Sequence, residues 1–149
     1  MRGRPWTGVH VRGTDKVHES PNLDKTFKDT TDFVDRIIEL NPSIGIFLLT
    51  DSLPVIREFQ NRYGGRLLFT QSRRSDSNQG VHQSGHDGVL IGEEVLVDTL
   101  LALKCDYFVG NRESNISMGI SSLHPWPPGF IFLLGEKNIR GENLFLHRR

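Results

Sequence analysis

The chain has 149 residues, a length suited to one domain. Its 18 Lys and Arg balance its 18 Asp and Glu, so the formal net charge is zero; this excludes the strongly basic surface of a nucleic-acid-binding domain and a polybasic membrane-surface domain. The single cysteine, Cys105, excludes an intramolecular disulfide framework. No apolar run approaches the roughly 18 residues of a membrane span.

The first half of the chain alternates strand and helix patterns. The continuous apolar run over 45–50 is typical of a strand buried on both faces of a parallel sheet. Asp51 or Ser52 is suited to cap the helix that follows, and Gly64 is suited to end it. The patterns predict strands over 7–12, 45–50 and 66–71, and helices over 27–40 and from Asp51 or Ser52 to Gly64.

The second half opens with a glycine- and serine-rich segment, 72–92, whose length suggests a functional loop. The helix expected over 93–104 is apolar almost all round, so we expect it to be buried. The proline-rich segment 124–129 excludes regular structure. The remaining predictions are strands over 106–109 and 130–134, a helix over 113–120 and a polar tail over 136–149.

This order of elements predicts an α/β fold, with a Rossmann-like, mostly parallel sheet and helices on both faces, over residues 1–135. Ligands of such sheets bind where the carboxyl ends of the strands meet. Polar side chains of this chain gather at those ends. They are His10, Arg12, Thr14, Asp15 and Lys16, then Thr50, Asp51 and Ser52, then Ser72, Arg73 and Arg74, and finally the segment 110–117.

His10 and Arg12 are two positions apart on the first predicted strand, so we expect both side chains on the same face. A guanidinium there can grip a phosphate or carboxylate with two parallel hydrogen bonds, which a lysine cannot offer. The structural alternative is an Arg12 paired with Asp15 or Asp51, beside a neutral, hydrogen-bonded His10.

Two further positions have a functional and a structural interpretation. Segment 110–115 lies where a helix is expected to begin, so its backbone N–H groups could bind an anion, or Ser114 could be an ordinary N-cap. Asp98 interrupts an apolar helix and needs hydrogen-bond donors if it is buried. Those donors could be neighbouring backbone groups or the ring N–H groups of a nucleobase.

The sequence gives only weak evidence for a metal site or a catalytic cysteine. His82, His86 and Asp87 have a spacing that could hold a metal, but they lie in the predicted loop without a supporting cysteine cluster, so we expect no metal site. No G-x-S-x-G motif is present. Cys105 is expected to be a small buried hydrophobic residue.

Three segments together resemble a known family. Residues 8–17, GVHVRGTDKV, resemble the H-x-R-x-x-D-K motif of the α1,6-fucosyltransferases. Residues 48–51, LLTD, resemble that family's strand ending in T-D. The pairs 97–98 and 114–115, on either side of the strand 106–109, resemble its third motif region.

The resemblance implies that residues 1–135 are the donor-binding half of a GT-B glycosyltransferase. Members of the family transfer fucose from GDP-β-L-fucose to a glycan acceptor, invert the anomeric centre and need no metal or other cofactor. Eukaryotic members lie in the Golgi, and the compartment of this chain stays open between the Golgi and the cytoplasm.

By matching position, the resemblance also assigns roles to single residues. Arg12 would clamp the β-phosphate, Glu19 would deprotonate the acceptor hydroxyl, and Lys16 would tune the charge beside it. Many members have a second arginine where this chain has Gly13. The residues expected to bind the donor are His10 and Asp98 at guanine, Ser114 and Asn115 at the pyrophosphate, and Asp15 and Asp51 beside Arg12.

Two other functions remain open from the residues alone. One is a non-catalytic Rossmann-like module that binds a nucleotide or phosphate. The other is a phosphatase-like hydrolase, suggested only by Arg12 and Asp51 at their strand ends. A metal requirement for turnover would favour it over the transferase.

Overall fold

The computed structural model describes residues 3–13, 23–76 and 88–135 of the chain. Its strands form one five-stranded parallel sheet in the order β3-β2-β1-β4-β5. This confirms the predicted parallel α/β sheet. The strands are β1 (Trp6–His10), β2 (Gly45–Leu49), β3 (Leu67–Leu68), β4 (Tyr107–Asn111) and β5 (Ile131–Leu134).

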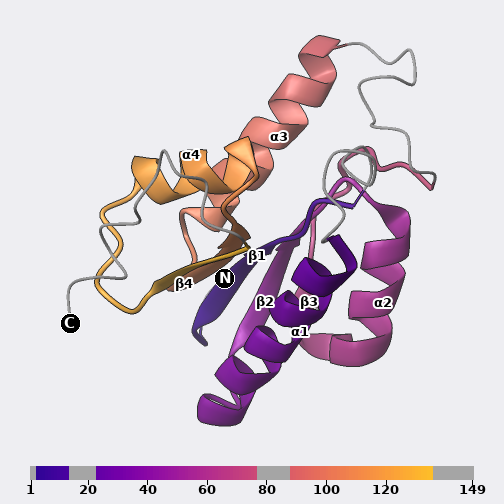
Figure 1. The fold of residues 1–149 in the computed structure, drawn as a ribbon. Coiled ribbons are helices and arrows are strands. Elements are labelled where there is room, and N and C mark those ends of the chain that lie inside the picture. Colours follow the sequence, from indigo (N-terminus) through magenta and orange to yellow (C-terminus); the bar gives the residue numbers. More distant parts are fainter. Residues whose placement is uncertain (1–2, 14–22, 77–87, 136–149) are drawn as a thin grey trace.

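Helices cover both faces of this sheet, as the element order predicts. Figure 1 shows α1 and α2 on one side, and α3 and α4 on the other. A short 3-10 turn joins α2 to β3. The helices are α1 (Leu23–Leu40), α2 (Leu53–Tyr63), α3 (Gly88–Ala102) and α4 (Asn115–Leu123), and the 3-10 turn is η1 (Gly64–Arg66).

The central strand β1 is buried along its whole length, and its side chains alternate between the two cores. Val9 packs into the core under α1 and α2, with Phe59 as a large partner from α2. Trp6 packs into the opposite core, which contains Phe47 and Phe108. His10 has the same parity as Trp6, so it leaves the sheet on the side of α3 and α4.

The connection from β3 back to β4 creates a crevice at the carboxyl edge of the sheet. The chain runs outward from β1 through β2 to β3, and then returns to pair β4 with the other side of β1. In open α/β sheets, ligands bind at such a reversal of strand order. His10 at the end of β1 and Asn111 at the end of β4 therefore border the expected binding position.

Two predicted strands extend two or more residues beyond the ends of the observed strands. The strand expected over 66–71 contains only Leu67–Leu68, because β3 is an edge strand with a single neighbour, β2. The first strand ends at His10, not at Arg12. Arg12 consequently belongs to the loop after β1, where strand alternation no longer places it on the same face as His10.

The expectation that the third helix is buried was wrong. Helix α3 begins at Gly88, and among its described residues only Asp98 and Ala102 are buried. It packs against the sheet and α4 through one narrow side, which leaves the opposite apolar side exposed. The exposed large apolar side chains of α3 are Val89, Leu90, Val95, Leu96, Val97 and Leu100.

Helix α3 is also the most apolar helix by composition, yet it has only 15 residues. None of the helices in the described ranges is both long and apolar enough to cross a membrane.

Candidate functional site

A pocket of about 190 Å³ opens at the carboxyl edge of the sheet. It lies between the ends of β1 and β2, the loop after β3, helix α3 and the first turn of α4. Its walls combine apolar side chains with a few polar groups, as is usual for small-molecule sites. The apolar wall residues are Leu49, Ile91, Val95 and Ile116.

His10 borders this pocket from the end of β1. Its side chain is buried, and its Nδ1 lies 2.7 Å from Ser117 Oγ on α4. Burial lowers the pKa of His10 from 6.5 to about 4, so the ring is neutral near pH 7. His10 is thus both the neutral, hydrogen-bonded histidine of the structural alternative and a lining residue of the pocket.

Asp98 reaches the same pocket from α3, and it is 8% exposed. Thr70 Oγ1 donates to Asp98 Oδ1 at 2.6 Å, and Ser72 Oγ donates to Oδ2 at 3.2 Å. The donors are therefore side chains of the loop after β3, and not the neighbouring backbone considered from the sequence. Burial raises the pKa of Asp98, while these two hydrogen bonds oppose the rise.

Arg74 supports the loop that carries Thr70 and Ser72. Its Nε donates to the carbonyl oxygen of Thr50 at 3.2 Å, and Nη1 donates to that of Ser72 at 2.6 Å. Burial lowers the pKa of Arg74, and the charge of Asp98 opposes this change. The guanidinium therefore fixes the loop and balances the buried carboxylate.

A second charged pair lies on the pocket wall. The Arg73 backbone N–H donates to Glu94 Oε2 at 2.9 Å, and Arg73 Nη1 lies 3.9 Å from Glu94 Oε1. Glu94 precedes Asp98 by four positions on α3, so both side chains face the pocket from one side of the helix.

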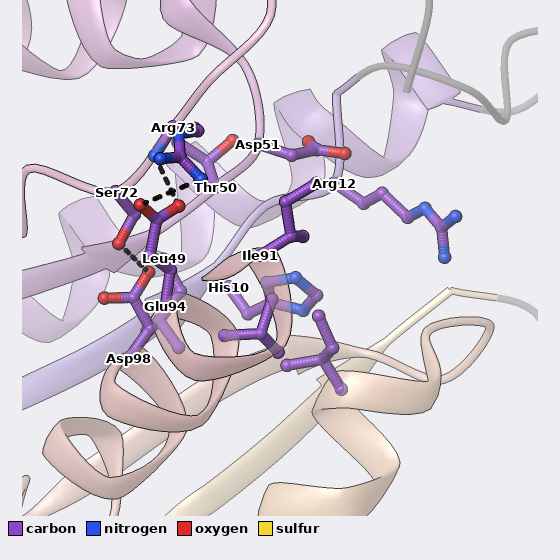
Figure 2. A pocket seen from close by; sticks show the side chains of 12 residues that line it. His10, Arg12, Leu49, Thr50, Asp51, Ser72, Arg73, Ile91, Glu94 and Asp98 are labelled. Carbon is purple, nitrogen blue, oxygen red and sulfur yellow. Dashed lines mark hydrogen bonds and ion pairs between the residues drawn. The ribbon is translucent and has the colours of Figure 1, made fainter. Parts of the chain in front are cut away.

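Arg12 and Asp51 occupy the rim. In Figure 2 the Arg12 side chain extends from the rim away from Asp98 and Ser72. Asp51 Oδ1 accepts a 3.0 Å hydrogen bond from the Gly13 backbone N–H, so this carboxylate also holds the turn after β1. A Cβ at Gly13 would lie 2.5 Å from the Cβ of Ser52, which explains why no side chain stands there.

The start of α4 lies beside the pocket, to which it contributes Ile116. Ser114 is the N-cap residue, but its side chain makes no capping hydrogen bond. Among the described residues, Ser114 Oγ is buried without any hydrogen-bond partner. The ordinary side-chain cap is therefore not formed, and the N–H groups of the first turn have no side-chain acceptor from Ser114.

The structure brings His10, Arg12, Asp51 and Asp98 to one pocket, with Ser114 and Asn115 at the adjacent helix start. The contributions of Thr70 and Glu94 were not predicted from the sequence, although Glu94 has a signal in its helical spacing from Asp98. Ser117 belongs to the polar segment 110–117 that was predicted at this edge, but its contact with His10 was not predicted. The predicted residues that lie outside the described residues are Thr14, Asp15, Lys16, Glu19, His82, His86 and Asp87.

The described part of the chain contains no group of three His, Cys, Asp or Glu side chains placed to hold a metal ion. Cys105 is buried, and burial raises the pKa of its thiol to about 12. It packs into the core under α3 and α4, as expected for a small hydrophobic residue.

Comparisons with known proteins support the fold alone. No protein-family model matches the chain, and no curated protein matches it. Among solved structures, the chain is similar to the NodZ α1,6-fucosyltransferase co-crystallised with GDP, with a TM-score of 0.59 and 18% sequence identity. The match covers 83% of this chain and 37% of that chain, so this chain spans little more than a third of its neighbour's length. The chain therefore has a fucosyltransferase-like fold.

Proposed function

We propose that this chain is the donor-binding half of a metal-independent fucosyltransferase, and that its pocket binds the guanine of GDP-fucose. One observation carries the proposal. Buried His10 and Asp98 both line the pocket at the carboxyl edge of the sheet, together with apolar walls. Arg12 lies on its rim, and the start of α4, which has no side-chain cap, lies beside it.

The chemistry of the pocket suits a guanine base. Leu49, Ile91 and Ile116 provide apolar surfaces for a planar ring. The Asp98 carboxylate can accept hydrogen bonds from two adjacent N–H donors, which guanine presents at its ring N1 and its amino group. Adenine places an acceptor at N1 and uracil offers a single N–H between two carbonyls, so both would fit this carboxylate less well.

The diphosphate is expected to lie outside the pocket. A volume of about 190 Å³ is below the roughly 300–1,000 Å³ of pockets that enclose a drug-sized ligand, so it suits a base and not a whole nucleotide sugar. The start of α4 offers backbone N–H groups and the positive end of the helix dipole to an anion. Ser114 Oγ, which is buried without a partner in the described residues, would then donate to a phosphate oxygen.

Arg12 and the start of α4 would supply the electrostatic part of catalysis. The acceptor hydroxyl oxygen forms a bond to the anomeric carbon as the bond from that carbon to the β-phosphate oxygen breaks, and GDP leaves with the electron pair. Donors fixed in advance around the leaving diphosphate are often the largest contribution to such a rate enhancement. Glu19 is proposed to take the hydroxyl proton, and Lys16 is proposed to tune the charge of the site.

Thermal unfolding in the presence of nucleotides tests the proposal. GDP binds only the folded state and should raise the melting temperature; a concentration of 100 times Kd adds about 2.7 kcal/mol of stability. ADP and UDP should give a much smaller shift at equal concentration. A missing GDP shift at millimolar concentration, or equal shifts for all three nucleotides, would contradict the guanine site.

Turnover is tested separately. Release of GDP from GDP-fucose, with a glycan acceptor and in the presence of EDTA, would support metal-independent transfer. Because the structural match spans only 37% of NodZ, a nucleotide-binding module without transfer activity is the second candidate. A GDP-specific shift without GDP-fucose turnover would favour that candidate.

A further inference from the structure

The side chain of Ser117 connects two parts of the pocket region. It is completely buried on α4, and its Oγ accepts a 3.0 Å hydrogen bond from the Asn111 backbone N–H at the end of β4. The same oxygen lies 2.7 Å from Nδ1 of His10. Ser117 thus contacts Nδ1 of His10, a residue that also lines the pocket.

The hydrogen-bond partners of Ser117 decide which nitrogen of His10 carries the proton. If Nδ1 were protonated, it would donate to Ser117 Oγ, and the buried Ser117 hydroxyl hydrogen would need another acceptor. Within the described residues there is no such acceptor. Two other serines of α4 do have an acceptor for the hydroxyl hydrogen, since Ser121 and Ser122 both donate to the carbonyl oxygen of Met118.

Only one placement of the protons therefore satisfies the hydrogen bonds of both Ser117 and His10 Nδ1. Ser117 accepts from the Asn111 N–H and donates its own hydrogen to an unprotonated Nδ1. The neutral ring then carries its proton on Nε2, for which the described residues provide no hydrogen-bond partner. Because His10 lines the pocket, this N–H is available to a ligand.

We propose that Ser117 is a positioning residue that fixes His10 as an Nε2–H donor, and that this donor recognises the carbonyl oxygen at position 6 of a purine. The proposal rests on the proposed function, since it concerns the same base. Asp98 accepts from the N–H edge of guanine, and His10 donates to the neighbouring carbonyl. A purine with an amino group at position 6 would place its own N–H donors against the His10 donor. Such a purine should therefore bind less tightly than guanine.

The first test is the tautomer of His10 in the ligand-free protein. In 15N-histidine-labelled protein, NMR correlation of ring nitrogens with ring protons distinguishes a protonated from an unprotonated nitrogen. The chain has six histidines, so the His10→Gln variant assigns the signal. We expect an unprotonated Nδ1 and a protonated Nε2, and the reverse pattern in the wild type would overturn the proposal.

The matched variants are Ser117→Ala and Ser121→Ala. Both serines are buried on α4, but Ser121 bonds to Met118 and not to His10. Ser117→Ala should produce a mixture of His10 tautomers, whereas Ser121→Ala should leave the wild-type pattern. An unchanged single tautomer in folded Ser117→Ala would contradict the positioning role; the wild-type measurement decides the tautomer even if that variant does not fold.

The second test compares GDP with the diphosphate of 2,6-diaminopurine riboside, which differs from GDP at the position-6 carbonyl and the adjacent N1 proton. The wild type should prefer GDP. Because a hydrogen bond contributes about 0.5–1.5 kcal/mol, Ser117→Ala should reduce this preference by up to about tenfold. Ser121→Ala should retain it.

The outcomes separate the two proposals. Binding of neither diphosphate by the wild type would overturn the guanine site, and the tautomer measurement would still decide the role of Ser117. Binding of GDP with the same preference in wild type and folded Ser117→Ala would overturn the role of Ser117 and leave the guanine site supported.

Discussion

Asp98 and Thr70 lie 28 positions apart in the sequence, and Thr70 Oγ1 donates a 2.6 Å hydrogen bond to the Asp98 carboxylate. Ser72 donates to the second oxygen of that carboxylate. Two hydroxyl donors thus tie the loop after β3 to α3 and hold a buried carboxylate against the pocket. Carboxylates have about four acceptor positions, so this one can still accept from a ligand.

Replacement of Asp98 by Asn should separate stability from binding. The raised pKa of Asp98 means that the folded state favours the protonated carboxyl. Its contribution to the free energy of unfolding is therefore greatest below the unfolded pKa, and it declines as the pH rises through the folded value. Asp98→Asn removes this group, so the decline with rising pH that Asp98 causes in the wild type should be absent in the variant. Melting temperatures from pH 3.5 to 7 measure this effect.

The same variant should lose the GDP-dependent thermal shift, because the amide nitrogen of Asn is a donor where the ligand requires an acceptor. Asp35→Asn is the control, since Asp35 pairs with Arg62 away from the pocket. A full GDP shift in Asp98→Asn would exclude Asp98 from the base site.

Arg12 should contribute to binding of the diphosphate and not of the base. Hydrogen bonds to charged groups contribute about 1.5–3 kcal/mol, so Arg12→Ala should weaken GDP binding by roughly 10–150-fold. Arg12→Lys should restore only part of this loss, because an ammonium lacks the planar fork of donors. Guanosine, which has no phosphate, should bind both variants as it binds the wild type. Calorimetric titration measures all of these affinities.

Arg57→Ala is the control for Arg12, since Arg57 pairs with Asp76 on an exposed part of the surface. Equal losses of GDP and guanosine binding in Arg12→Ala would show a general disturbance of the site. Unchanged GDP binding would remove Arg12 from the proposed function.

His10 should make the fold sensitive to acid. Its pKa is about 4 in the folded state against 6.5 for an ordinary histidine, so the unfolded chain takes up a proton first as the pH falls. The free energy of unfolding should therefore have its full value above pH 6.5. It should fall by up to about 3 kcal/mol between pH 6.5 and 4. In His10→Gln this slope should disappear. Denaturant unfolding at several pH values measures it, and equal slopes in both proteins would contradict the burial of a neutral His10.

The sequence predicted the sheet well because strand and helix patterns alternate clearly. Apolar runs such as the one over 45–50 are long enough to fix the strands, and parallel connections restrict how these can be arranged. Because the strands are parallel, the polar residues at their ends could be placed near the carboxyl edge. These include His10 and Ser72, which donates to Asp98. Arg12 could also be placed at that edge. The direction of its side chain could not be predicted, because β1 ends before Arg12.

Contacts between distant segments could not be predicted. Ser117 lies among apolar residues of α4, and nothing local indicates that it meets His10, 107 positions away. The composition of α3 indicates an apolar helix but not which side the rest of the chain covers. That depends on the narrow contact with β1, β2 and α4, which leaves Val89, Leu96 and Leu100 exposed.

Gly110 on β4 should tolerate no side chain, because α4 approaches the strand closely at this point. A Cβ on Gly110 would lie 2.6 Å from Ser117 Oγ and 2.8 Å from Ser117 Cβ. Overpacking of this kind costs about 1–3 kcal/mol, so Gly110→Ala should lower the melting temperature by several degrees.

Gly92→Ala is the matched control for this effect. Gly92 lies in α3, and a Cβ there would meet nothing within 4 Å. Alanine is favoured over glycine in a helix by up to about 1 kcal/mol, so this variant should be slightly more stable than the wild type. The same substitution should thus have opposite effects at two positions. If Gly110→Ala were as stable as Gly92→Ala, α4 could not lie so close to β4, and the 2.7 Å contact between Ser117 and His10 would be wrong as well.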